Sequence, residues 1–267
     1  MKTAAIMILA ATAAAIAGPD TVRLTHSVDP ITIELGAGIA CADSDPLQTS
    51  LSNSFWRAFK PTDFGVTNDF SVLQFEFGVE TLELPTLDAI EITVNFYETF
   101  SGTAPAVGLP LIGTTSAELS ERSLELVTID ASASVTAGAA LVVEISVPSL
   151  RDLAGGTLGD RFIPGGNFAG QTAPWYVSSI DCGILDPTDV ADFGFPDSNQ
   201  VVTVIGEQSG ACCCVDIDQD GQLTIFDFLA FQSAFDAGDL LADFDGDGEL
   251  TILDFLAFQT QFDAGCP

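Results

Sequence analysis

The stretch DIDQDGQLTIFDFLAFQSAFDAG, residues 216–238, recurs as DFDGDGELTILDFLAFQTQFDAG, residues 243–265. The two copies are offset by 27 residues and agree at 17 of 23 positions. Internal repetition of this strength indicates a duplicated structural unit rather than a bias of composition. In each copy, aspartates at alternate positions precede a glycine and an apolar segment. The repeat therefore predicts two loops, each leading into a helix, with the helices over 224–235 and 251–262.

The acidic residues of each loop have the spacing of a calcium-binding loop. Ca²⁺ takes six to eight oxygen ligands, and alternate side chains of a curled loop can converge on one ion. A glycine at the sixth position allows a backbone turn in which a Cβ would clash. The predicted ligands of two calcium ions are Asp216, Asp218, Asp220, Gln222, Thr224 and Asp227 in the first loop, and Asp243, Asp245, Asp247, Glu249, Thr251 and Asp254 in the second.

Metal binding is expected to be coupled to folding of this tail, because four carboxylates crowd each loop and repel one another without a cation. Two other readings of the loops are less consistent with the sequence. Acidic solvated turns would not require the glycine, the closing aspartate and the repeat together. A thrombospondin-like calcium array would lack the two helices.

The tail differs from a usual EF-hand, because aspartate closes each loop and no entering helix precedes Asp216. A loop with an exiting helix, present twice, resembles a dockerin, the duplicated module that docks secreted proteins onto cohesin-bearing partners. The flanking cysteines and the DAGCP ending resemble the GC-type dockerins at the ends of many exported bacterial proteins. The resemblance covers residues 214–267.

The resemblance implies a surface that contacts a cohesin-like or other surface protein. Its implied contact residues are Ile225, Phe226, Gln232 and Ser233 in the first copy, and Ile252, Leu253, Gln259 and Thr260 in the second. The first two positions of each set are often small and polar in cellulosomal dockerins but are apolar here, which implies a more apolar partner surface. Because the copies nearly match, two modes of binding are expected. Eight further large apolar residues repeat between the copies, and most of them are expected to form the core: Phe228, Leu229, Phe231 and Phe235 with Phe255, Leu256, Phe258 and Phe262.

Residues 1–17 are predicted to be a signal peptide, with Lys2 followed by an apolar run and an Ala-Ile-Ala cleavage site. This run is too short to span a membrane, and no second stretch reaches spanning length. The chain is therefore predicted to be secreted or displayed on a cell surface. Its 38 acidic and 7 basic residues give a net charge of -31, which repels nucleic acid and attracts cations.

Export makes the six cysteines candidates for disulfides. Cys41 and Cys182 lie near opposite ends of the long N-terminal region, and a bond between them is expected to tie its first strand to a late loop. A second bond, Cys214–Cys266, would join the ends of the tail and stabilise it by typically about 2–4 kcal/mol. The pairing of Cys212 and Cys213 stays open.

Residues 18–207 are predicted to be β throughout, because short runs rich in Val, Ile and Phe alternate with Gly, Pro and Asn clusters. The predicted fold class is mainly β, an antiparallel β-sandwich or jelly roll, followed by a linker at 208–213 and the small helical domain at 214–267. The predicted strands include ITIEL (31–35), SVLQFEFGVE (71–80), AIEITVNFYE (89–98), LELVTI (124–129), ALVVEISV (140–147) and VVTVIG (201–206).

No catalytic motif is evident in the β region. Its single histidine, His26, is expected at the surface, and neither G-x-S-x-G nor HExxH occurs. Trp56 is expected in a core strand, whereas Trp175 and Tyr176 follow a proline and are a candidate platform for a sugar ring. The stretches NSFWRAFKPTDFG, FEFGVE and DFGFPDSN resemble a recurring β module of secreted bacterial proteins.

A non-catalytic exported protein with a calcium-dependent docking tail is the favoured function. The alternative is a carbohydrate-active enzyme or carbohydrate-binding protein carried by a dockerin. An enzyme of this kind would need two carboxylates about 5–9.5 Å apart. A plain calcium buffer is the third hypothesis, and it would not require an exposed apolar pair at Ile225 and Phe226.

Overall fold

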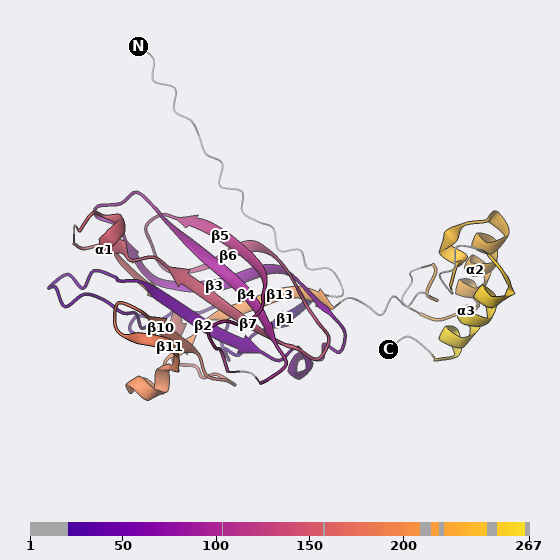
Figure 1. Ribbon diagram of the computed structural model, residues 1–267, viewed down its shortest axis with the longest axis horizontal. Helices are drawn as coiled ribbons and strands as arrows, with labels where there is room; N and C mark the ends of the chain where they lie inside the picture. Colours follow the sequence, from indigo (N-terminus) through magenta and orange to yellow (C-terminus); the bar gives the residue numbers. More distant parts are fainter. Residues whose placement is uncertain are drawn as a thin grey trace, which may run out of the picture. The chain divides into compact units, whose positions relative to one another are not determined.

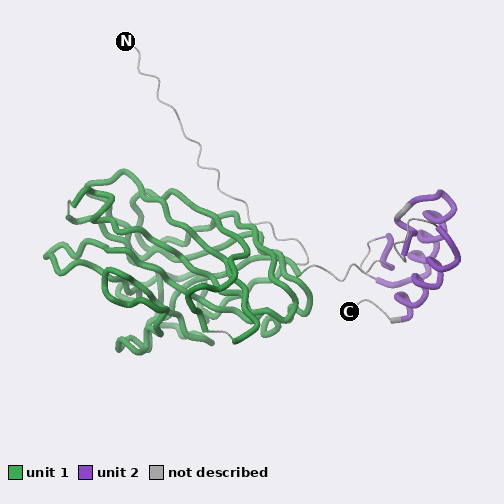
Figure 2. Tube along the Cα trace, viewed as in Figure 1, with its two compact units in different colours: residues 1–208 green, residues 209–267 purple. Residues whose placement is uncertain are grey.

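The computed structural model describes residues 21–102, 104–156, 158–208, 215–218, 222–244 and 250–264. The chain divides into two compact units, Met1–Gln208 and Ser209–Pro267 (Figure 2). The first unit is built from antiparallel sheets and the second from helices (Figure 1). The predicted signal peptide and all four cysteines of the tail lie outside the described residues.

Two large antiparallel sheets make up the first unit (Figure 1). Five of the predicted strand segments, 71–80, 89–98, 124–129, 140–147 and 201–206, fall to within one residue in strands of these sheets. The first sheet has the order β1 (Thr21–Leu24), β13 (Val202–Gln208), β3 (Phe70–Glu83) and β6 (Arg122–Val135), with β8 (Arg161–Pro164) also paired to β3. The second has the order β11 (Ile184–Asp189), β10 (Tyr176–Ser179), β2 (Asn53–Phe59), β7 (Ala140–Val147), β4 (Ile90–Thr99) and β5 (Leu111–Leu119).

Smaller elements connect these strands. A third, two-stranded sheet pairs β12 (Asn199–Gln200) with β9 (Gly166–Asn167). The short helical turns of the unit are η1 (Pro61–Phe64), α1 (Leu150–Leu153) and η2 (Val190–Phe193). The prediction of a mainly β protein with antiparallel pairing and a few helices is therefore confirmed.

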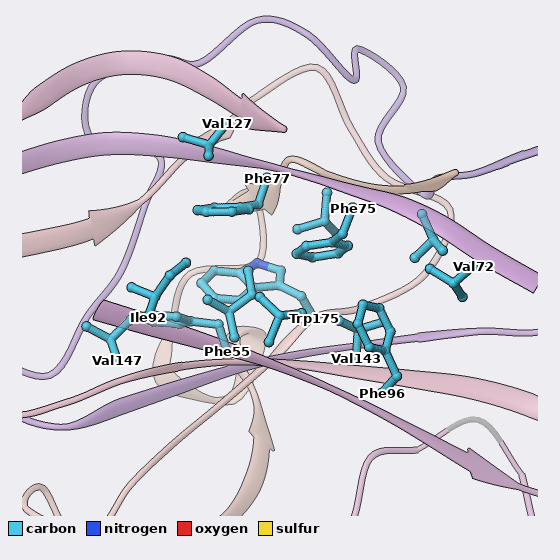
Figure 3. Packing of buried hydrophobic residues seen from close by; sticks show 14 of the residues in the cluster. Phe55, Val72, Phe75, Phe77, Ile92, Phe96, Val127, Val143, Val147 and Trp175 are labelled. Carbon is cyan, nitrogen blue, oxygen red and sulfur yellow. The ribbon is translucent and has the colours of Figure 1, made fainter. Parts of the chain in front are cut away.

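A single apolar core takes side chains from both large sheets (Figure 3). Side chains alternate between the two faces of a strand, so Phe75 and Phe77 of β3 point to the same side and their rings stack 5.8 Å apart. Phe96 of β4 meets Phe75 edge-on at 6.0 Å. Residues of the two sheets are therefore in direct ring contact within this core.

One predicted strand is wrong. Residues 31–35 contain a bend at Ile31 and the start of a turn at Leu35 but no strand, and the two residues are 68% and 67% exposed. The sequence ITIEL alternates apolar and polar residues as a strand does, but its backbone makes other hydrogen bonds. The N–H of Glu34 donates to the carbonyl of Gly166 at 2.8 Å, and the Asp29 side chain accepts from the N–H of Thr32 at 3.0 Å. A local hydrogen bond from the backbone to the Asp29 side chain therefore forms here in place of the pairing between strands.

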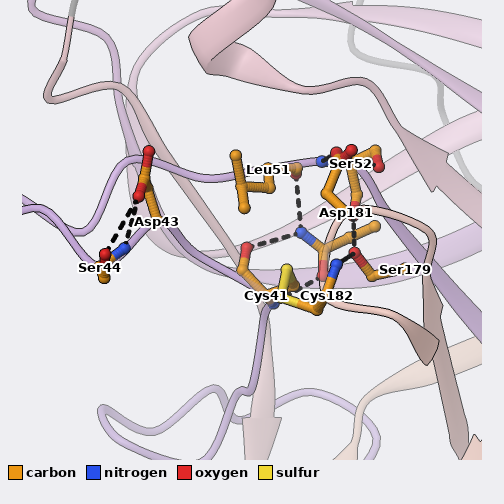
Figure 4. Close-up of a disulfide and its surroundings, with 9 residues drawn as sticks. Cys41, Asp43, Ser44, Leu51, Ser52, Ser179, Asp181 and Cys182 are labelled. Carbon is orange, nitrogen blue, oxygen red and sulfur yellow. Dashed lines mark hydrogen bonds between the residues drawn. A yellow bond between two sulfur atoms is a disulfide. The ribbon is translucent and has the colours of Figure 1, made fainter.

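The predicted disulfide between Cys41 and Cys182 is confirmed (Figure 4). It joins residues 141 positions apart in the chain. Asn53 at the start of β2 holds one end, donating from its side-chain amide to the carbonyl of Cys41 at 3.0 Å and accepting from the Cys41 N–H at 2.7 Å. The Ser179 hydroxyl accepts from the N–H of Cys182 at the other end. The bond thus links the loop before β2 to the turn between β10 and β11, so the late loop is as expected but the other end is a loop and not the first strand.

His26 is buried rather than on the surface, which corrects the expectation from the sequence. Only 7% of the residue is exposed, and its ring stacks on Phe59 at a centroid distance of 5.2 Å. Its Nε2 lies 3.1 Å from the Ala58 carbonyl, which can only accept, so Nε2 carries the proton and Nδ1 accepts from the Thr172 hydroxyl at 2.7 Å. Both ring nitrogens of the neutral histidine therefore have a hydrogen-bond partner.

The second unit packs α2 (Ile225–Ala237) against α3 (Ile252–Ala264), with η3 (Leu240–Ala242) between them in the chain. Both predicted helices are present. Phe231 and Phe258, equivalent positions in the repeat, stack at 4.4 Å in the centre of a small apolar core. None of the described helices is long and apolar enough to cross a membrane.

We predict a dependence of folding stability on pH that comes from His26. Burial, helped by the nearby Arg57 guanidinium, lowers the pKa of His26 from 6.5 to about 4. The unfolded chain therefore takes up a proton below pH 6.5 that the folded chain does not bind until about pH 4. Stability from this residue is present above pH 6.5 and falls by at most about 1.4 kcal/mol per pH unit as the pH drops through that window.

Urea unfolding of the wild type and of His26→Gln at pH 7.0 and pH 5.0 measures this effect. Glutamine removes the titration, so the free energy of unfolding of the wild type should fall more steeply than that of the variant. Other titrating groups contribute equally to both proteins. Equal pH dependence in the two proteins would show that His26 is not held neutral.

Candidate metal centre

Three carboxylates of the first loop come together in the structure. Asp216 and Asp218 lie in the loop and Asp227 in the first turn of α2, and one oxygen atom of each lies within 4.8 Å of the others. This grouping matches the predicted first, third and closing positions of the calcium loop. Each ligand oxygen of a Ca²⁺ ion lies about 2.3–2.6 Å from the ion, so two of its ligands can be up to about 5 Å apart. Oxygen atoms within 4.8 Å of one another could therefore contact the same cation.

Asp227 is completely buried and organises the loop around it. Its Oδ2 accepts from the N–H of Thr224 at 2.8 Å, and its Oδ1 accepts from the N–H of Asp218 at 3.4 Å. In return the Thr224 hydroxyl caps α2 and accepts from the N–H of Phe226 at 3.1 Å. This reciprocal arrangement is a capping box, which satisfies N–H groups that a helix terminus leaves without partners. The residue that closes the loop therefore also starts the helix.

The hydrogen bonds keep Asp227 ionised. Burial alone raises the pKa of this carboxyl, but the backbone N–H groups of Thr224, Asp218 and Ile217 outweigh it, so that the pKa lies below its usual value. Donors that favour the charged form have this effect on a carboxylic acid. Carboxylates bind hard cations in their ionised form, so Asp227 is in the form that could do so.

The second loop repeats this geometry around Asp254, which is also completely buried. Its Oδ2 accepts from the N–H of Thr251 at 2.6 Å, and its Oδ1 accepts from the N–H of Phe244 at 2.9 Å. The Thr251 hydroxyl accepts from the N–H of Leu253 at 3.1 Å. The threonine–aspartate hydrogen bonds at the helix starts are thus duplicated, whereas the N–H that donates to Oδ1 belongs to Asp218 in the first copy and to Phe244, the equivalent of Ile217, in the second.

Of the other predicted ligands, four are among the described residues and four are not. Gln222 is exposed and Asp243 is half-buried, while the hydroxyls of Thr224 and Thr251 are both engaged as helix caps. The predicted ligands Asp220, Asp245, Asp247 and Glu249 lie outside the described residues.

Apolar side chains cover an outer face of both helices. Ile225 and Phe226 are each 63% exposed, and their equivalents Ile252 and Leu253 are 68% and 54% exposed. Of the eight repeated apolar residues, most of which were expected in the core, six pack there and the other two, Leu229 and Leu256, are exposed. One turn along from Ile225, Leu229 lies on the same side of the helix, so it extends the apolar face that the sequence indicated only in part.

Two equivalent grooves run between the helices. One, of about 360 Å³, is lined by Ile225 of α2 and by Gln259, Phe262 and Asp263 of α3. The other, of about 330 Å³, is lined by Ile252 of α3 and by the corresponding residues of α2, namely Gln232, Phe235 and Asp236. Every residue in one groove has its counterpart 27 positions away in the other. The helix pair therefore presents the same surface twice.

The remaining predicted contact residues lie on the same helices. Gln232, Ser233, Gln259 and Thr260 are all exposed. The hydroxyls of Ser233 and Thr260 donate to the carbonyls of Leu229 and Leu256, at 2.8 and 2.7 Å. Their methylene and methyl groups are consequently held in a defined orientation at the surface.

The predicted ligand platform is wrong for Trp175. Only 1% of this residue is exposed, and its indole N–H donates to the carbonyl of Ser198 at 2.8 Å within the core of the first unit. The preceding proline suggested a loop, but the ring anchors that loop to the core instead. Tyr176 is half-buried in β10 and lines a small cavity of about 160 Å³ with His26 and Thr172.

Comparison with known proteins assigns no family to the chain, because no family model and no curated protein sequence matches it. The chemistry of the two loops and the helix surface is therefore the basis for inferring a function.

We predict that Asp227→Ala weakens the helical unit even without metal. The substitution removes the acceptor for two loop N–H groups and half of the capping box, which should cost about 1–3 kcal/mol. Hydrogen–deuterium exchange of the full chain in chelator should show faster exchange in residues 222–232.

The matched control is Asp236→Ala, which removes an exposed carboxylate from the last turn of the same helix. It should leave exchange unchanged or slightly slower, because a negative charge near a helix C-terminus is unfavourable. Equal acceleration by both substitutions would contradict the structural role of Asp227.

Proposed function

We propose that this chain is an exported, non-catalytic anchoring protein. Residues 214–267 form a dockerin-like module that binds two calcium ions and docks onto a cohesin-like or other surface protein. Residues 18–207 form a β-sandwich that the module holds in place. The observation that carries this proposal is the convergence of Asp216, Asp218 and Asp227 at the start of a helix whose outer face is apolar.

Calcium has a clear structural task in this proposal. Two loop carboxylates and the buried Asp227 carboxylate converge within 4.8 Å, and no lysine, arginine or histidine occurs after residue 161. A divalent cation would supply the missing positive charge and draw the loop onto the first turn of α2. Since the closing aspartate also caps the helix, binding would stabilise the helix that carries the docking face.

The exposed apolar surface favours docking over calcium buffering. A buffer gains nothing from exposed isoleucine, phenylalanine and leucine side chains, whereas an apolar patch on a small unit is typical of a surface that a partner covers. The patch occurs once on each helix, and the two grooves are equivalent. Two binding orientations related by the repeat are therefore part of the proposal.

Export is supported by the chemistry of the first unit. The disulfide between Cys41 and Cys182 requires an oxidising compartment, in agreement with the predicted signal peptide. The chain is accordingly proposed to act in the secreted fraction or at a bacterial cell surface.

We predict that the full chain binds two calcium ions in an isothermal titration. The double substitution Asp216→Asn with Asp218→Asn should reduce the stoichiometry to one, because an amide keeps the shape of the side chain but removes its charge. The control Asp192→Asn with Asp197→Asn removes two exposed charges from the first unit and should leave two sites. Loss of binding in the control, or two sites in the loop variant, would contradict the assignment.

We further predict that docking requires calcium and uses either helix. Against a panel of purified, immobilised cohesin domains, the pair Ile225→Ser with Phe226→Ser should weaken binding only about twofold, the statistical loss of one of two orientations. The pair Ile252→Ser with Leu253→Ser should do the same, and all four substitutions together should abolish binding. Binding that survives the fourfold variant would rule out this face as the docking surface.

A further inference from the structure

A separate cavity lies on the β unit, on the outer face of the larger sheet. It has a volume of about 410 Å³, and Ser52, Ser54, Trp56, Tyr97, Glu144 and Ser178 are among the residues that line it. Residues of the β4–β5 connection and of the β10–β11 hairpin border it, including Val107 and Ile184. The cavity is of the size that proteins use for small ligands.

Strand register places one polar row across this face. Trp56 of β2 pairs with Glu144 of β7, and Glu144 pairs in turn with Asn95 of β4. Directly opposed residues of antiparallel strands project to the same side, with Cβ atoms about 4.5–5.5 Å apart. Phe55 and Val143, the preceding residues on β2 and β7, point the other way and belong to the core. The carboxylate of Glu144 therefore stands beside the Trp56 indole, away from the core.

Glu144 is a buried carboxylate without a charged partner among the described residues. Only 8% of it is exposed, and its hydrogen bonds come from neutral groups: the Ser54 hydroxyl to Oε1 at 2.6 Å, and Asn95 and the Tyr97 hydroxyl to Oε2 at 3.0 and 2.7 Å. Oε1 thus accepts a hydrogen bond from Ser54 and, as a carboxylate oxygen, has a second lone pair that can accept another.

No positive charge of the described chain faces this carboxylate. Lysine, arginine and histidine are absent from the residues that line the cavity. Arg57 is adjacent in β2 but lies on the opposite face, where its guanidinium donates to Gln171 at 2.7 Å. Taking a carboxylate out of water is costly unless a cation compensates its charge. Among the residues that line the cavity, none supplies a positive charge to balance Glu144.

Two aromatic rings next to Glu144, those of Trp56 and Tyr97, form a surface that can bind a cation. The rings of Trp56 and Tyr97 stack at a centroid distance of 5.8 Å, and the indole N–H is directed to Ser178 at 2.9 Å. Burial and then the hydrogen bond to Glu144 raise the pKa of Tyr97, so it stays a neutral donor. Aromatic rings beside a carboxylate are a setting in which ammonium groups are bound by both charge and cation–π attraction.

We propose that this cavity binds a primary alkylammonium group, with the nitrogen donating to Oε1 of Glu144 and the alkyl chain lying along Trp56. The serine hydroxyls around the cavity can accept the remaining ammonium hydrogens. The net charge of -31 raises the local concentration of such a cation. The ligand can be a free amine or the side chain of a lysine, and the proposal does not depend on calcium or on docking by the tail.

The test uses the full chain with calcium present and follows its tryptophan indole N–H signals by NMR. The protein has two tryptophans, so the indole of Trp175, buried in the core, is an internal control for Trp56. Butylammonium chloride and a backbone-blocked lysine are the probes, and butanol is the neutral probe of matched shape. We expect either cation to shift the Trp56 signal saturably and butanol to leave it unchanged.

Glu144→Gln should weaken binding of the cation at least tenfold, whereas the control Glu91→Gln, which removes an exposed charge from β4, should not. Binding of only the free amine, or only the blocked lysine, identifies the source of the ammonium group. Equal shifts by butanol and butylammonium would overturn the proposal without any variant, as would full affinity in a folded Glu144→Gln protein. Saturable binding of methyl glucoside but of neither cation would overturn it in favour of a neutral sugar site.

Discussion

Carboxylates that are buried in this protein have almost no basic side chains to pair with, and this constraint shapes both of its units. The chain has 38 acidic and only 7 basic residues. Among the buried carboxylates Glu76 is paired with Arg23, but Glu80, Glu144, Asp160, Asp227 and Asp254 are held by neutral donors. Backbone N–H groups, hydroxyls and amides provide their hydrogen bonds instead of guanidinium or ammonium groups. Such donors satisfy the carboxylate oxygens without supplying a positive charge, so these are positions at which a cation has much to contribute.

The two proposed sites are consequences of that constraint in different settings. In the helical unit, Asp227 is fixed by the N–H groups at the start of a helix and stands close to two further carboxylates, which suits a divalent metal ion. In the sheet, Glu144 is a single carboxylate with neutral donors and two aromatic rings around it. One negative charge beside apolar rings suits a monovalent organic cation better than a metal, which requires more oxygen ligands.

Most of the helical site could be predicted from the sequence because its contacts are local. The spacing of Asp216, Asp218 and Asp227 predicted a convergence that the structure contains. Most of the eight apolar residues of the repeat were expected in the core and are there, but the sequence did not show that Leu229 is one of the exposed ones, because only packing of α2 on α3 decides which face is covered. The burial of His26 and Trp175 was likewise not predictable, since their partners lie far away in the chain.

The amino-acid sequence by itself determined that the protein is mainly β with a duplicated helical tail, and it was sufficient to identify the Cys41–Cys182 disulfide. Periodicity, repetition and the scarcity of cysteines in the β region are properties of the chain alone. The tertiary structure decided which residues meet across strands. Glu144 carries no motif, and its setting exists only because β2, β7 and β4 are neighbours in one sheet. Register between strands distant in the chain depends on packing of the whole sheet, which no local pattern encodes.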